Sequence, residues 1–278
     1  MANPSTLIVF GSSPESFYIG HGRRHFIENM PQSFTTHAQT DLNISMTLWI
    51  SVSRSLEVWV SYNVPNSQYH FPASINQAIR DHLGGTDAAQ YVSFPDSTNP
   101  GAYFAKGKNA GAWNGVLDNF FVTQIKEYKA DMPNFDARLK GMIFGKGKTF
   151  LCLLDSGFRG YLDENEIVGD HHPLRKVLQQ HMDGWTLEIG STLCFYDSRY
   201  FVLYFKRPGQ SGMTMHWNLP PTMAQKLHAL EEAAKQPEEQ IALMQESQMW
   251  QQVVQNRMNA EMQMSLMFQN SIRGTVLR

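Results

Sequence analysis

The sequence predicts a mostly β chain with short helices, an α+β fold in which five βββα units close into a five-bladed, propeller-like ring and a long C-terminal helix follows. The first observation is an apolar run that recurs in steps of 42, 42, 50 and 51 residues, anchored on Phe10, Val52, Phe94, Phe144 and Phe195. The second is that two aromatic-rich runs and a helical pattern follow each copy. Repeats of this length bury their apolar faces by stacking on neighbouring repeats.

The first two runs of each unit predict two strands. First strands are expected at residues 7–11, 48–52, 91–94, 142–145 and 193–196. The second runs carry the β-branched and aromatic residues typical of a half-buried strand, at residues 17–18, 58–59, 103–104, 150–151 and 200–201.

A third strand and a helix complete each unit. The third runs are centred on Phe26, Phe71, Trp113, Tyr161 and Trp217. They follow turn-forming segments at Gly22, 66–67, 107–111, Gly157 and 208–212. Helical spacing then appears at residues 32–38, 75–83, 117–125, 174–178 and 223–230. Proline stands near the start of four of these helices, where its missing N–H group is not needed.

The five units predict one repeat domain over residues 5–235. Their approximate bounds are 5–40, 46–84, 88–130, 139–183 and 190–235. Closing the units into a ring removes exposed sheet edges, which is why we expect the ring. The alternative is two packed sheets with the helices outside.

Residues 236–272 predict a long helix rich in methionine and glutamine. Six of the 15 methionines lie in it, and apolar residues from Leu243 to Leu266 recur at helical spacing. One interpretation is a helix that docks on the ring and seals the junction of its first and last units. The other is a homodimer contact through residues 238–272, because flexible thioethers adapt to irregular apolar surfaces.

Composition narrows the classes of function. The formal net charge is −2, so there is no surplus of cations to neutralise nucleic acid. Neither a signal peptide nor a membrane span is apparent, which predicts a cytoplasmic protein with no membrane partner. The two cysteines, Cys152 and Cys194, occupy different positions of the repeat, so we expect buried free thiols rather than a disulfide.

Three segments partly match the residue patterns of phosphate-binding or metal-binding sites, but each lacks residues that the pattern requires. Residues 147–149 read Gly-Lys-Thr, but the glycine that a phosphate loop needs five residues earlier is Met142. Residues 155–166 fit a calcium loop at three positions but have Gly157 and Arg159 where two oxygen ligands belong. The acidic and histidine-containing loop 163–172 has no established metal-ligand spacing. We therefore expect neither a metal nor a cofactor.

The repeat itself produces one constellation. His25, His70 and His216 share one position in the third strand, where the other two units have Ala112 and Gly160. Facing inward in a closed ring, three imidazoles would meet around a bound molecule and act as general acid and base. A three-histidine metal site and a set of surface histidines are the alternatives.

These histidines lead to a hypothesis of function. We expect a cofactor-independent isomerase, cyclase or lyase that acts by proton transfer on a small apolar or aromatic substrate. His25, His70 and His216 are its expected catalytic residues, and the expected substrate-binding residues are Arg24, Trp113, Tyr161, Arg199 and Trp217. Further polar groups near the strands are Arg23, Asp197, Tyr204 and Lys206. The alternative is a non-enzymatic binding module, lectin-like or a protein-interaction scaffold, with one aromatic site in each unit.

Overall fold

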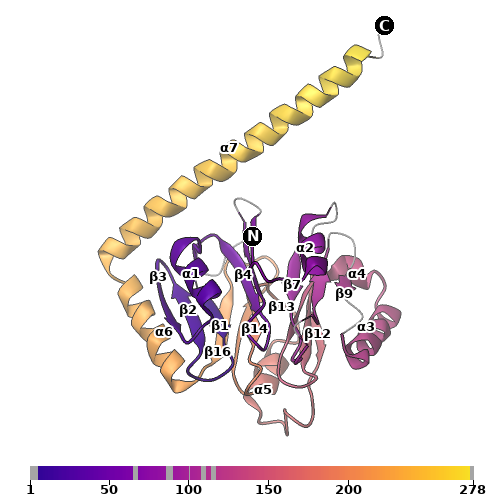
Figure 1. The fold of residues 1–278 in the computed structure, drawn as a ribbon, viewed down its shortest axis with the longest axis vertical. Coiled ribbons are helices and arrows are strands. Elements are labelled where there is room, and N and C mark those ends of the chain that lie inside the picture. The colour runs from indigo at the N-terminus through magenta and orange to yellow at the C-terminus, as the bar shows by residue number, and fades with distance from the viewer. Residues whose placement is uncertain are drawn as a thin grey trace.

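The computed structural model describes residues 6–64, 68–85, 90–99, 101–107, 111–113 and 117–275. It is a mixed α+β structure, with most strands in small antiparallel sheets and short helices between them (Figure 1). The fold class predicted from the sequence is confirmed at this level. The predicted turn at 66–67 and most of the one at 107–111 lie outside the described residues.

Each of the first three units is a three-stranded antiparallel sheet followed by a helix. The first contains β1 (Thr6–Phe10), β2 (Phe17–His21), β3 (Arg24–Glu28) and α1 (Gln32–Thr40). The second contains β4 (Thr47–Val52), β5 (Trp59–Asn63), β6 (Gln68–His70) and α2 (Gln77–Gly84). The third contains β7 (Tyr91–Ser93), β8 (Phe104–Lys106), β9 (Gly111–Trp113) and α3 (Asn119–Asp131).

The last two units vary this plan. A short helix, α4 (Phe135–Arg138), precedes the fourth sheet, which contains β10 (Leu139–Phe144), β11 (Phe150–Leu154) and β12 (Phe158–Tyr161) before α5 (Pro173–Gln180). In the fifth unit the first strand is divided into β13 (Thr186–Leu187) and β14 (Thr192–Leu193). Both pieces pair with β15 (Phe201–Lys206), which also pairs with β16 (Thr214–Asn218). Between the pieces, Gly190 has φ +101°, which glycine adopts readily and which breaks the strand.

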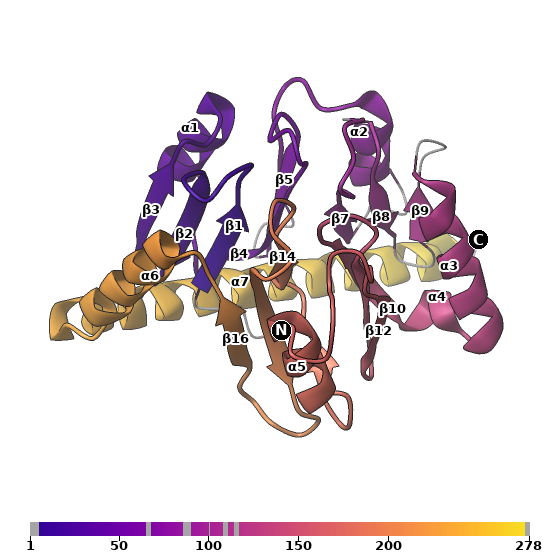
Figure 2. The same ribbon diagram turned by 90° about the horizontal axis from the view of Figure 1, so that it is seen from below.

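The first strands of the five units pack against one another. Contacts join β1 to β4, β4 to β7, β7 to β10, β10 to β14, and β14 back to β1. Figure 2 looks along these strands, with the five sheets spread around the middle of the molecule. Near the C-terminal ends of the first strands, the residues from all five units enclose a cavity of only about 30 Å³. The middle of the structure at that level is therefore nearly filled by side chains.

Each helix packs on the unit that follows it. His37 of α1 stacks on Trp59 of β5, and Tyr128 of α3 lies against Phe150 of β11. Helix α6 (Pro221–Ala234), which follows the fifth sheet, contacts β2 and β3 of the first unit in the same way. The hydroxyl of Tyr204 in β15 also donates a hydrogen bond of 2.7 Å to the backbone carbonyl of Thr6. The two ends of the repeat domain are thus joined by apolar packing and by a buried hydrogen bond.

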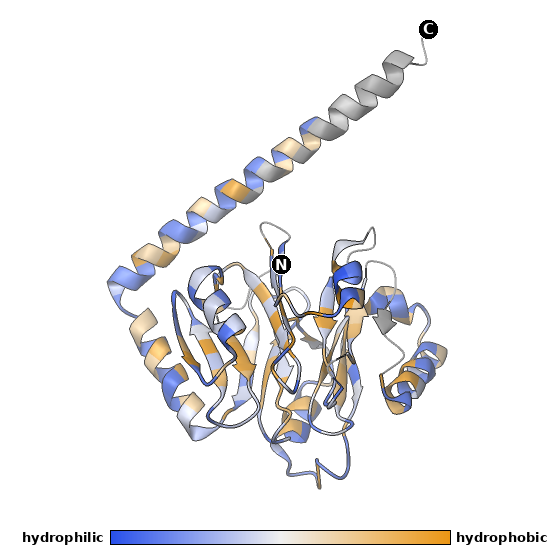
Figure 3. Cartoon of the chain, in the orientation of Figure 1, coloured by the Kyte–Doolittle hydropathy of each residue, from blue (hydrophilic) through white to orange (hydrophobic). Residues whose placement is uncertain are grey.

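Helix α7 (Pro237–Thr275) begins beside the first unit and then extends away from the strands (Figure 1). Glu239 forms an ion pair of 2.6 Å with Arg24, and Glu246 accepts hydrogen bonds from Asn43 and Ser45. Beyond these contacts the helix mixes polar and apolar residues without a long apolar stretch (Figure 3), and Met258 and Met262 are exposed. No helix among the described residues has the length and apolar character needed to span a membrane.

Candidate functional site

A pocket of about 300 Å³ opens where the first strands begin, opposite the small cavity at their ends. We call it the lysine pocket because Lys106, Lys140 and Lys206 line it together with one carboxylate, Glu188. Four of the five units contribute residues. The remaining lining residues are mainly apolar and include Leu48, Tyr62, Gln90, Ala137, Leu139, Ile189 and Met213.

The strands place these charges for a simple reason. Lys106 and Lys206 are the last residues of the second strands β8 and β15, and Lys140 lies at the start of the first strand β10. Adjacent strands within a unit are antiparallel, so the end of a second strand lies beside the start of a first strand. Strand ends from three units therefore bring three ammonium groups to the same end of the molecule.

Hydrogen bonds fix the orientation of Glu188. Its carboxylate accepts a hydrogen bond of 2.6 Å from the hydroxyl of Thr186 and lies 3.0 Å from the ammonium of Lys140. Lys106 is 2% exposed, and its ammonium donates to the backbone carbonyl of Gly107 at 2.5 Å. With three lysines and one glutamate, the pocket carries an excess of positive charge. Partly buried cations of this kind attract an anion more strongly than cations in bulk water do.

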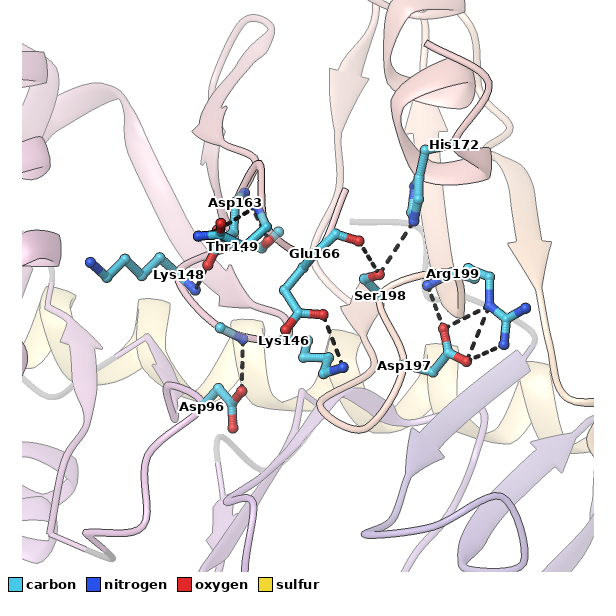
Figure 4. A network of polar contacts seen from close by, with 12 residues as sticks. Asp96, Lys146, Lys148, Thr149, Asp163, Glu166, His172, Asp197, Ser198 and Arg199 are labelled. Atoms are coloured by element: carbon cyan, nitrogen blue, oxygen red, sulfur yellow. Dashed lines mark hydrogen bonds and ion pairs between the residues drawn. The ribbon is translucent and has the colours of Figure 1, made fainter. Parts of the chain in front are cut away.

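The opposite end of the strands carries a network of polar contacts between the units (Figure 4). Asp96 accepts from Arg54 at 2.6 Å and from the backbone amide of Gly147 at 2.7 Å. Lys146 pairs with Glu166 at 2.9 Å. These charges are paired within the protein, so the network holds neighbouring units together and is a poorer candidate for binding an outside ligand.

The rejected motifs contribute groups to this network. In the Gly-Lys-Thr segment, the backbone amide of Lys148 donates a hydrogen bond of 2.9 Å to the carboxylate of Asp163. Burial opposes ionisation of Asp163, but the hydrogen bonds from the amides of Lys148 and Asn165 outweigh it and lower the pKa of this carboxyl. A phosphate would need the backbone amide of Lys148, and a cation would need the carboxylate of Asp163. These two groups are hydrogen-bonded to each other.

The strand register pairs His25 with Gly20, His70 with Ser61 and His216 with Leu203, each on the second strand of its own unit. Ala112 and Gly160 pair with Ala105 of β8 and Leu151 of β11. The third strand is the outer strand of each sheet, and the first strands meet in the middle.

Each of these histidines has its own surroundings. His25 stacks on Tyr18 of its own unit, with ring centroids 5.7 Å apart. His70 stacks on His37 of the preceding helix at 4.7 Å, and His216 meets His181, at the end of its preceding helix, edge to face at 4.4 Å. Burial lowers the pKa of His25 and of His216, the latter also through the nearby His181. Among the described residues, the ring contacts of these histidines are with Tyr18, His37 and His181, and none joins two of the three.

Four of the predicted substrate-binding residues have partners within the protein. Arg24 pairs with Glu239 of α7, and Arg199 forms a two-point ion pair with the neighbouring Asp197. Tyr161 packs edge to face on Phe120 at 4.7 Å, and Trp217 lies 5.7 Å from the ring of His228. Trp113 belongs to β9, but its side chain lies outside the described residues.

The lysine pocket was not predicted from the sequence, because its lysines do not lie in the alignment column of His25, His70 and His216. Lys106 and Lys206 each end a second strand, whereas Lys140 lies near the start of a first strand, so aligning the units does not bring all three lysines into register. The available signal was that a lysine closes the apolar second strands β8 and β15. Comparisons with protein-family models, curated proteins and solved structures found no match to this chain.

Proposed function

We propose that the five units form a five-bladed, propeller-like ring that binds a small molecule carrying a carboxylate or phosphate group in the lysine pocket. The circuit of contacts between the first strands supports the ring, as does the seam between Tyr204 and Thr6. The binding module was the alternative to the enzyme in the expectations from sequence. The present proposal places its ligand in a single central pocket rather than on each unit.

The observation that carries the proposal is the gathering of three lysines from three units around one pocket. Like charges repel, and desolvating an ammonium group costs free energy, so a fold gains no stability from bringing three of them together. A bound anion would offset both costs. The single glutamate is already engaged by Lys140 and Thr186, which leaves the pocket as a whole electropositive.

The lining also suggests the shape of the ligand. Leu48, Leu139 and Ile189 form apolar wall on the same pocket as the lysines. Pockets of about 300 Å³ stand at the small end of those that bind metabolites. A compact ligand with an apolar or aromatic body and one anionic group fits both the size and the lining.

Titration calorimetry with phenyl phosphate, benzoate and neutral benzamide tests this proposal on the full chain. The two anions should bind at one molecule per chain, and benzamide should not. Lys140→Met and Lys206→Met should each weaken phenyl phosphate at least roughly 10-fold, because one charge-assisted hydrogen bond contributes about 1.5–3 kcal/mol. Lys176→Met, which removes an exposed lysine on α5, is the matched control. Equal binding by all variants, several ligands per chain, or no binding of either anion would contradict the proposal.

A second candidate is an acid–base enzyme that uses the same pocket. Glu188 favours it, since this carboxylate lines the cavity and is held in place by Thr186 and Lys140. Such a residue can accept a proton from a bound substrate. Catalysis by His25, His70 and His216 stays a prediction, as does self-association through residues 238–272. Substrate turnover that is lost in Glu188→Gln with ligand binding retained would favour the enzyme over the binding module.

A further inference from the structure

A groove between the first two units is lined by a histidine and a carboxylate from the end of α1 and by a second histidine from β6. His37 and Asp41 are four residues apart at the end of α1, so their side chains lie on one face of the helix. His70 comes from β6, where it is paired directly with Ser61 of β5. One nitrogen or oxygen from each of His37, Asp41 and His70 lies within 4.8 Å of the others.

The ring of His37 is fixed by its neighbours. It stacks on Trp59 with centroids 4.8 Å apart, and its Nε2 atom lies 2.9 Å from the hydroxyl oxygen of Ser61. When Nε2–H donates to Ser61, the lone pair of Nδ1 is left toward Asp41, whose carboxylate is 3.8 Å away. Metal-binding histidines are oriented in this way, with the second ring nitrogen held by a hydrogen bond.

The groove is accessible and polar. An open pocket of about 330 Å³ is lined by His37, Asp41 and His70 together with Ser33, Thr36, Trp59, Tyr69, Phe71 and Pro72. His37 is 5% exposed, whereas the side chain of Asp41 is 58% exposed.

We propose that His37, Asp41 and His70 form a binding site for a divalent transition-metal ion, with Zn²⁺ the best-suited occupant. Two imidazoles and one carboxylate are a donor set that zinc accepts in tetrahedral geometry, with the fourth position open to water. Zinc–ligand bonds of about 2.0–2.2 Å bring ligand atoms to roughly 3.5 Å from one another. Asp41 and His70 lie at the edge of the groove and need to move inward by about 1 Å. This site is separate from the lysine pocket and does not depend on the function proposed there.

The fifth unit supplies a matched control. His181 at the end of α5 and His216 of β16 form an equivalent pair, with rings 4.4 Å apart. The residue four positions after His181 is Trp185, so this groove has no carboxylate at the place of Asp41. In addition, Nδ1 of His181 lies 2.8 Å from the backbone carbonyl of Val177, where it is engaged as a donor. The proposal thus predicts metal binding in one groove and not in the other.

The test is titration of the full chain with Zn²⁺, followed by calorimetry and, with Co²⁺, by visible absorption. Wild type should bind one Zn²⁺ with a Kd of about 1 µM or below. Asp41→Asn and His70→Gln should each weaken it at least roughly 10-fold, because each removes one of three ligands. His216→Gln should leave the Kd within about twofold. Circular dichroism and thermal unfolding confirm that each variant is folded.

Three outcomes would overturn the proposal. They are no Zn²⁺ binding by wild type at about 100 µM, unchanged Kd in both Asp41→Asn and His70→Gln, and an equal loss in His216→Gln. The last two would assign the ion to other histidines of the chain. A tetrahedral Co²⁺ spectrum that disappears in Asp41→Asn and persists in His216→Gln would support this groove as the site.

Discussion

Two buried tyrosines on second strands provide a direct test of how the first and last units are joined. Tyr204 is 4% exposed, and its hydroxyl donates a hydrogen bond of 2.7 Å to the backbone carbonyl of Thr6, which joins the fifth unit to the first. Tyr18 is fully buried, and its hydroxyl has no hydrogen-bond partner among the described residues. Replacing each with phenylalanine removes one oxygen atom and leaves the ring in place, so the variants differ chiefly in the hydrogen bond.

The expected effects have opposite signs. Tyr204→Phe loses a buried hydrogen bond and leaves a carbonyl short of a partner, which should lower the free energy of unfolding by about 1–2 kcal/mol. In a domain of this size each kcal/mol shifts Tm by about 2–4 °C, so the expected fall is roughly 2–8 °C. Tyr18→Phe removes a hydroxyl that was desolvated without compensation. Its free energy of unfolding should stay unchanged or rise by up to about 1 kcal/mol.

The assay is urea denaturation followed by circular dichroism, with the slope of the transition checked against wild type. Hydrogen exchange adds a local readout, because Tyr204→Phe should speed exchange of amides in β1 and β14 more than in β7. The reasoning is refuted if Tyr204→Phe is as stable as wild type, or if Tyr18→Phe loses as much stability as Tyr204→Phe.

Three further predictions concern packing, pH and the last helix. A Cβ atom at Gly160 would stand 2.3 Å from a backbone carbonyl oxygen, so Gly160→Ala should cost at least about 2 kcal/mol by urea denaturation, whereas Gly84→Ala, with open space around it, should cost nothing. Burial lowers the pKa of His216, so its contribution to stability is present above about pH 6.5 and is lost at lower pH; His216→Gln should reduce the fall in stability between pH 7.5 and 5, and parallel curves would count against this. Deleting residues 251–278 should leave Tm within about 2 °C, because the described residues of α7 that contact the first unit lie at or before Trp250. A larger fall would place a stabilising contact beyond Trp250.

Much of the local structure could be predicted from the sequence because the repeat supplies five examples of each element. The weak helical pattern at residues 32–38 is helical in the structure, as its place in the unit suggested. The divided strand of the fifth unit was harder, since its break depends on the backbone at Gly190. Helix α4 was missed because four residues give no periodic signal. Both buried free cysteines were predicted correctly.

The sites depended on packing between units, which the repeat pattern does not contain. His25, His70 and His216 lie on third strands, but the partners of His70 and His216 come from the helices of the preceding units. His37 therefore escaped notice, because its own position on α1 belongs to a different column. Lysines at strand ends gather only when the ends of several sheets face one pocket. Which unit follows which in space is decided by tertiary contacts rather than by local sequence.

The packing of α6 on β2 has a consequence for synthesis of the protein on the ribosome. The first unit emerges from the exit tunnel about 200 residues before the helix that will cover it. At translation rates of about 5–20 residues per second, its apolar side is uncovered for roughly 10–40 s. Nascent chains stalled before residue 221 should therefore engage chaperones that bind apolar segments, and release should follow once the final helix has been made.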